Sequence, residues 1–161
     1  MDNSTQNEQI EMKALSENEI ALGTLYSKFA NLFPEDKSFW MGITKDEMLH
    51  GSWITELSTM VEQGSVVMEA ERFKLAAIQQ FSEYINEQIK ITETESISAI
   101  KALSISMDLE RSLLESDIFK VYDTDDVATS DILDRLTKST EEHFQQVQNR
   151  WTQEKNDFSP R

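Results

Sequence analysis

The scarcity of helix-breaking residues limits what this chain can fold into more than any other feature. Its 161 residues include only 4 glycines and 2 prolines, while residues that favour helices, such as glutamate, glutamine, leucine and lysine, are frequent. Apolar residues recur every three or four positions, which places them on one face of a helix. No segment of useful length has the two-residue period of a strand. The sequence therefore predicts an all-α protein, and its length is typical of one domain.

Five helical segments follow from this periodicity and from the residues that interrupt it. We expect them at residues 13–33, 37–62, 68–91, 97–122 and 128–153. Pro34 ends the first segment, because proline disfavours the helical conformation of the residue before it. Gly64 is suited to a left-handed cap beyond the second segment. Residues 123–126 are expected to form a loop whose polar side chains cap the fifth segment.

Both ends of the chain are expected to lie outside the helical domain, which spans residues 13–153. Residues 1–12 are predicted to form a flexible arm and residues 154–161 a loose tail. The first dozen residues lack the basic and apolar regions of a secretory signal. No apolar run approaches the ~20 residues of a membrane-spanning helix. We therefore expect a cytoplasmic protein that does not enter a membrane.

Charge and cysteine content narrow the classes of function. The chain carries 15 basic and 30 acidic residues, which gives a formal net charge of −15. This charge disfavours binding to nucleic acids and to anionic membrane surfaces, whereas it suits metal cations. The sequence has no cysteine, which excludes disulfides, thiolate nucleophiles, zinc ribbons and cysteine-ligated iron–sulfur clusters.

Polar residues interrupt the apolar faces of four of the predicted helices. In chain order, they are Glu19, Glu47, His50, Glu110, Thr140 and His143. A buried carboxylate is costly unless it is paired or binds a metal, and a cation would resolve the repulsion within such a group. Mixed carboxylate and imidazole ligands suit iron, manganese or zinc. The pattern therefore predicts a metal site with the ligands Glu19, Glu47, His50, Glu110 and His143.

The order of these residues resembles the rubrerythrin-like branch of the ferritin-like superfamily. The matching stretches are residues 19–26, 32–36, 39–40, 47–50, 107–115 and 141–143. Together they extend over most of the chain, from about residue 15 to about residue 150. A single Glu-x-x-His motif is weak, but its position after the Phe-Pro-Glu-Asp turn, together with the other interruptions, is more specific.

The resemblance implies a four-helix up-down bundle, with the segment at 68–91 in a long crossover. It further implies a di-iron protein that acts in iron handling or in peroxide and oxygen chemistry, with an external electron donor, and that forms a homodimer. The five predicted ligands match ligand positions of the family. On this interpretation Glu19, Glu47 and His50 hold one iron, and Glu110 either bridges the two irons or holds the second with His143.

Two features depart from the family pattern. Thr140 stands where the second Glu-x-x-His motif would have its glutamate, and threonine cannot bridge two metals. The neighbouring Glu141 and Glu142 do not share the helix face of His143. The cysteine-rich rubredoxin module is also absent. Two functions are therefore compatible with the sequence: a peroxidase-type oxidoreductase, and a non-catalytic structural or interaction bundle that has lost a complete metal site.

The candidate ligands of the first two helices also have plainer interpretations. Residues 16–19 read Ser-Glu-Asn-Glu, which fits a capping box in which Glu19 only satisfies the start of a helix. Glu47 and His50 are three residues apart, so they can form an internal hydrogen-bonded pair that needs no metal.

The candidate ligands of the predicted helices at 97–122 and 128–153 also have interpretations that need no metal. Glu110 can accept a hydrogen bond from a core tyrosine, and His143 can be a buried histidine with ordinary hydrogen bonds. Tyr26 lies on the same helix face as Glu19. It either packs in the core or donates a hydrogen bond to a metal ligand.

Overall fold

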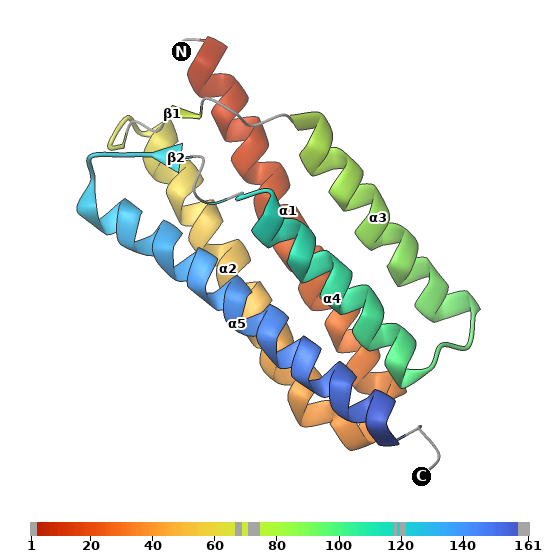
Figure 1. Cartoon of the computed structure of the whole chain (residues 1–161). Coiled ribbons are helices and arrows are strands. Elements are labelled where there is room, and N and C mark those ends of the chain that lie inside the picture. The colour runs from red at the N-terminus through yellow and green to blue at the C-terminus, as the bar shows by residue number, and fades with distance from the viewer. Residues whose placement is uncertain (1–2, 67–68, 71–74, 118, 120–121, 158–161) are drawn as a thin grey trace.

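The protein is all-α in a computed structural model that describes residues 3–66, 69–70, 75–117, 119 and 122–157 (Figure 1). Its helices are α1 (Asn3–Leu32), α2 (Lys37–Glu62), α3 (Leu75–Thr94), α4 (Ala99–Glu115) and α5 (Val127–Asp157). A 3-10 turn, η1 (Pro34–Asp36), joins the first two helices. Two short strands, β1 (Glu69–Ala70) and β2 (Tyr122–Asp123), pair antiparallel.

The five helices lie side by side with their axes roughly aligned (Figure 1). α1 and α2 run antiparallel, and so do α4 and α5. α3 packs against α1 and returns the chain along the length of the molecule, so that α2 and α4 run in the same direction. α3 is therefore a crossover helix between two antiparallel helix pairs.

Local residues explain several helix boundaries. α1 ends at Leu32, and the 3-10 turn begins at Pro34, which cannot continue a helix. Gly64 has a φ of +68° beyond the end of α2, which confirms the predicted left-handed cap. Ser98 and Asp126 cap α4 and α5, because each side chain accepts a hydrogen bond from a backbone N–H three residues ahead.

The ends of the chain are more helical than the sequence predicts. α1 begins at Asn3, so the predicted flexible arm is helical from that residue onward. Met12 is buried in the core, which adds a turn to the apolar face of the helix. α5 continues to Asp157, and its last turns hold the Lys155 ammonium 4.9 Å from the centre of the Trp151 ring. The prediction of a loose tail is therefore wrong for residues 154–157.

The middle of the chain also differs from the predicted boundaries. α3 begins at Leu75, while residues 67–68 and 71–74 of the region predicted to start it lie outside the described part. α4 ends at Glu115 rather than near residue 122, and Asp117 beyond it has a φ of +48°. Tyr122–Asp123 pairs with Glu69–Ala70 instead of extending the helix. Strands of two residues are too short to show an alternating pattern.

Close packing of α1 against α2 brings two of the site's helices together. A Cβ atom on Gly51 would lie 2.9 Å from Ile20 Cγ1, and one on Gly23 would lie 2.9 Å from Met48 Cε. Only glycine permits this approach without moving the facing side chain. Among the helices that the structure describes, none combines the length and apolar character needed to cross a membrane.

Candidate metal centre

The five predicted ligands meet in the core between α1, α2, α4 and α5. Glu19 comes from α1, Glu47 and His50 come from α2, Glu110 comes from α4, and His143 comes from α5. Each exposes no more than 1% of its surface. Buried ionisable side chains are rare unless they are paired or coordinate a metal. Helix packing thus brings together residues that are up to 124 positions apart in the sequence.

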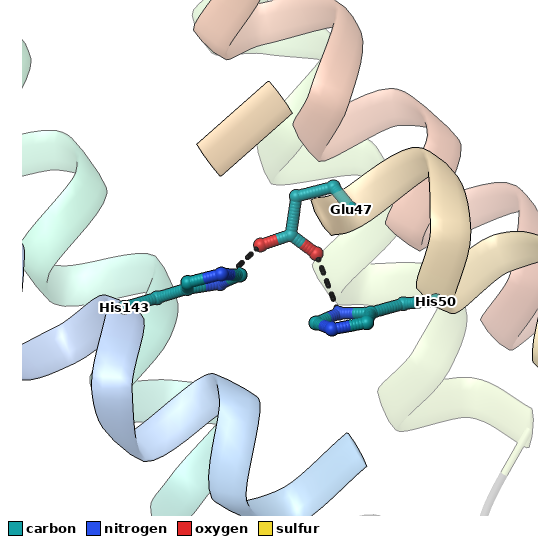
Figure 2. A group of neighbouring side chains, drawn as sticks. All are labelled: Glu47, His50 and His143. Carbon is teal, nitrogen blue, oxygen red and sulfur yellow. Dashed lines mark hydrogen bonds and ion pairs between the residues drawn. The ribbon is translucent and has the colours of Figure 1, made fainter. Parts of the chain in front are cut away.

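Glu47 lies at the centre of this group, between two imidazoles (Figure 2). Its Oε2 is 3.1 Å from Nδ1 of His50, and its Oε1 is 2.8 Å from Nδ1 of His143. The two imidazole rings are stacked, with their centroids 5.4 Å apart. One possible ligand atom from each of the three residues lies within 4.8 Å of the other two, so the group could hold a metal ion.

Two further carboxylates flank this trio on opposite sides. Oε2 of Glu19 is 3.4 Å from Nδ1 of His50, and Oε2 of Glu110 is 3.9 Å from Nδ1 of His143. The other oxygen of Glu110 accepts a 2.7 Å hydrogen bond from the Tyr26 hydroxyl. The alternative prediction that Glu110 bonds to a core tyrosine is therefore confirmed. This bond still leaves the second oxygen of Glu110 facing the histidine.

The second ring nitrogen of each histidine, Nε2, contacts a side chain on the other histidine-bearing helix. Nε2 of His50 lies 2.8 Å from the Ser139 hydroxyl on α5, and Nε2 of His143 lies 3.2 Å from Oδ2 of Asp46 on α2. Because an ionised carboxylate only accepts hydrogen bonds, Nε2 of His143 must donate to Asp46. In neutral His143, Nδ1 then carries a lone pair directed at the carboxylates. Such outer hydrogen bonds are typical of metal-ligating histidines.

Several buried atoms of the cluster lack a hydrogen-bond partner within the described part of the chain. They are Oε2 of Glu19, Oε1 of Glu47, Oε2 of Glu110 and Nδ1 of His143. The Glu47 and His143 atoms are 2.8 Å apart, but they are not aligned for a hydrogen bond. A buried polar atom without a partner is costly. All four atoms offer the oxygen and nitrogen lone pairs that a cation requires, so the residues present fit a metal ion.

Mutual interactions shift the pKa values of the cluster strongly. Burial and the nearby charge of Glu47 raise the pKa of Glu19 well above its ordinary value and that of Glu110 to about 8. Burial opposes charge on the histidines, but the carboxylates prevail and raise the pKa of His50 to about 10 and that of His143 to about 9. Burial likewise opposes charge on Glu47, yet the two adjacent imidazoles hold its pKa well below its usual range. Without a metal, the cluster therefore holds several protons at neutral pH.

The two histidine-bearing helices carry matching segments. The corresponding residues are Asp46, Glu47 and His50 on α2, and Ser139, Thr140 and His143 on α5. In each segment the first residue contacts the outer histidine nitrogen of the other segment. This reciprocal arrangement makes Thr140 the counterpart of the central Glu47.

Thr140 does not replace the missing carboxylate. It is buried, and its hydroxyl donates a 3.0 Å hydrogen bond to the backbone carbonyl of Leu136 on its own helix. Glu141 and Glu142 are exposed, and α5 is continuous through them, so neither side chain turns inward. This geometry agrees with the prediction that Glu141 and Glu142 do not share the helix face of His143, because adjacent positions of a helix face different directions.

Two contacts at the site were not predicted from the sequence, and one alternative prediction is wrong. Asp46 and Ser139 were not singled out, although each directly precedes a position on the polar face of its helix. Residues 16–19 lie within α1, so they do not form a capping box at its start. Instead, the Ser16 hydroxyl donates a 2.8 Å hydrogen bond to the Gly51 carbonyl and links α1 to α2.

Comparisons of the chain with protein-family models, with curated proteins and with solved structures find no match. The chemistry of the cluster is therefore inferred from its own geometry. That geometry combines a shared carboxylate, two anchored imidazoles and two flanking carboxylates in a buried site.

Proposed function

We propose that this chain is a ferritin-like, non-haem iron protein of the rubrerythrin type, which acts in iron handling or in peroxide and oxygen chemistry. The observation that carries the proposal is the set of four buried ligand atoms, on Glu19, Glu47, Glu110 and His143, that find no hydrogen-bond partner among the described residues although each carboxylate oxygen lies within 3.9 Å of a histidine Nδ1. A cation among them would satisfy all four and would offset the repulsion between the carboxylates.

The helix topology supports a ferritin-like arrangement. Ferritin-like bundles place carboxylate and histidine ligands on four helices whose inner faces meet in the core. Here the ligands come from two antiparallel helix pairs, and α3 provides the crossover between them. A long crossover of this kind distinguishes ferritin-like bundles from bundles in which short loops join every neighbouring pair of helices.

The chain's own residues prepare the site for metal chemistry. Glu47 is placed to serve both histidines, while Asp46 and Ser139 hold the imidazoles with Nδ1 directed inward. Tyr26 fixes the orientation of Glu110. Bound iron would supply the redox chemistry with oxygen or peroxide. Manganese and zinc also suit these ligands, so the experiment must identify the metal.

Metal content tests this proposal directly. The protein would be purified without chelator, reconstituted anaerobically with ferrous iron and separated from unbound metal. We expect bound iron that is oxidised when oxygen or peroxide is added. The double variant Glu47→Ala/His50→Ala should bind none, whereas Glu142→Ala, which removes an exposed carboxylate, should bind as much as the unaltered chain. Equal iron content in both variants would contradict the proposal.

A non-catalytic structural bundle is the second candidate function. The Tyr26–Glu110 hydrogen bond and the contacts of Glu47 with both histidines also link the helices without a metal. Buried ion pairs are often no more stabilising than apolar residues of similar size. If leucine at positions 47 and 50 raised the melting temperature, and the unaltered chain bound no metal, this second function would be favoured.

A further inference from the structure

A small pocket lies beside Thr140, between the end of α4 and the middle of α5. Its volume is about 110 Å³, and its walls include Leu113 and Leu114 from α4 and Thr137 and Glu141 from α5. Asp117, just beyond the end of α4, also lines it. The pocket is therefore located where the second histidine-bearing helix carries threonine in place of glutamate.

The pocket is close to one end of the metal-binding cluster. Leu113 and Leu114 follow Glu110 by three and four residues, which places them one turn along the same face of α4. Thr140 precedes His143 by three residues and shares its face of α5. The walls of the pocket thus lie one turn from the Glu110–His143 pair, whose facing atoms lack hydrogen-bond partners.

The chemistry of the lining suits a cation. The charged side chains among the lining residues, Asp117 and Glu141, are both acidic. The hydroxyls of Thr137 and Thr140 donate to backbone carbonyls of their own helix, so their oxygens keep lone pairs for a passing ion. Clefts lined by one sign of charge concentrate counter-ions and accelerate their association.

We propose that this pocket is the route by which a divalent metal ion enters the buried cluster. Exposed Glu141 attracts the ion, and the short Thr140 side chain leaves open the space that a glutamate would fill. This inference rests on the proposed function, because it concerns access to the same site. It gives the departure at Thr140 a role in metal exchange, which iron handling requires.

At the other end of the cluster, α1 and α2 pack closely, and a pocket of about 470 Å³ on that side is lined by residues that include Ser16 and Thr55 but neither Glu19 nor His50. Near Glu19, the Ser16 hydroxyl bonds to the Gly51 carbonyl and lies 2.8 Å from the Thr55 hydroxyl, which joins α1 to α2. The close approach of the two helices at Gly51 leaves no room for even a Cβ atom.

The rate of cobalt(II) uptake by the whole chain tests the route. Trp53 lies with its ring 5.8 Å from that of His50, so quenching of tryptophan fluorescence reports arrival of the ion. We expect Thr137→Phe, which fills the pocket, to slow uptake by about tenfold or more, because entry then requires a conformational change. Thr152→Phe is the matched control, since it places the same ring on an exposed position of α5. It should leave the rate unchanged.

A second pair of variants tests attraction at the entrance without altering the packing. Glu141→Gln should slow uptake by about two- to fivefold at low ionic strength and weaken its dependence on salt. Glu142→Gln removes the same charge from the adjacent exposed position, which does not line the pocket. It should change the rate less.

Equilibrium metal content separates failure of this inference from failure of the proposed function. The inference is overturned if Thr137→Phe takes up cobalt at the unaltered rate, if Thr152→Phe slows uptake equally, or if both glutamine variants behave alike. It is also overturned if Thr137→Phe lowers the final cobalt content, because the variant would then act on the site rather than on access. If the unaltered chain binds no metal at equilibrium, the proposed function itself fails.

Discussion

The cluster has two halves that are built alike but differ in one side chain. The first comprises Glu19, Glu47 and His50 on α1 and α2; the second comprises Glu110, Thr140 and His143 on α4 and α5. In the first half, both carboxylates lie within 3.4 Å of the histidine Nδ1. In the second, the half's own carboxylate lies 3.9 Å away, and the counterpart of the central glutamate is a threonine. The comparison indicates that helix packing brings polar side chains together in both halves, whereas the number of carboxylates would set how strongly each half holds a metal on the proposed function.

The surroundings of the two halves differ as well, because the first half is closely packed and the second lies beside a pocket. The first half lies against the close contact between α1 and α2. The second half adjoins the pocket at Thr140, and one oxygen of Glu110 is already engaged by Tyr26. We therefore expect the first half to hold a metal tightly and the second to hold one weakly and exchange it.

The largest expected effect comes from Glu47→Gln, because this residue serves both halves. Loss of its charge should lower metal affinity in both by at least about 100-fold, which exceeds the usual effect of residues that only support ligands. Glu110→Gln should weaken only the second half. Calorimetric titration with cobalt(II) measures both affinities. If the two variants lowered the affinities for the first and the second cobalt(II) ion equally, the division into halves would be refuted.

Thr140→Glu should remove the difference between the halves. A carboxylate at this position would complete the second Glu-x-x-His motif, and we expect the second metal to bind about 10- to 100-fold more tightly. Thr140→Gln is the control of similar size without the charge, and it should bring little gain. If both variants behaved alike, the missing charge would not be the cause of the asymmetry.

Metal affinity should rise with pH. In the metal-free protein, the pKa values of His50, His143 and Glu110 are raised to about 10, 9 and 8. These groups therefore hold protons at pH 7 that a metal must displace. Each displaced proton makes affinity rise about tenfold per pH unit until the pH exceeds that group's pKa. Titrations between pH 6.5 and 8.5 in buffers of different ionisation enthalpy measure the protons released; none released would contradict the expectation.

The smallest expected effect is that of Tyr26→Phe. The substitution removes the hydrogen bond to Glu110, which should cost about 1 kcal/mol of stability. It should also weaken the second metal by a few-fold, because Glu110 loses its fixed orientation, and leave the first metal unchanged. Thermal unfolding and cobalt titration measure the two effects. If the affinity for the first metal ion fell more than the affinity for the second, Tyr26 would not act through Glu110.

Local sequence signals were sufficient for the helical fold and for much of the site. The bounds of α2, Lys37–Glu62, agree with the prediction because Pro34 and Gly64 mark its ends. The polar interruptions identified buried residues, because the apolar periodicity shows which face of each helix points inward. The metal function attached to those residues stays a prediction.

Features that depend on contacts between distant segments could not be predicted. Met12 is buried by contacts outside its own segment, and the short strands depend on pairing between residues more than 50 positions apart. On α4, Leu109 and Leu113 are buried, whereas Met107, which precedes Glu110 by three residues, is only half-buried. The histidine partners Asp46 and Ser139 are 97 and 89 positions from the rings that they contact.

The most direct test of the account is the number of metal ions that the unaltered chain retains after anaerobic reconstitution with ferrous iron and gel filtration. We expect about one tightly held iron per chain, with a second that binds only in excess ferrous iron. Two tightly held irons would contradict the asymmetry of the halves. No bound iron, with a melting temperature unchanged by its addition, would contradict the metal centre itself.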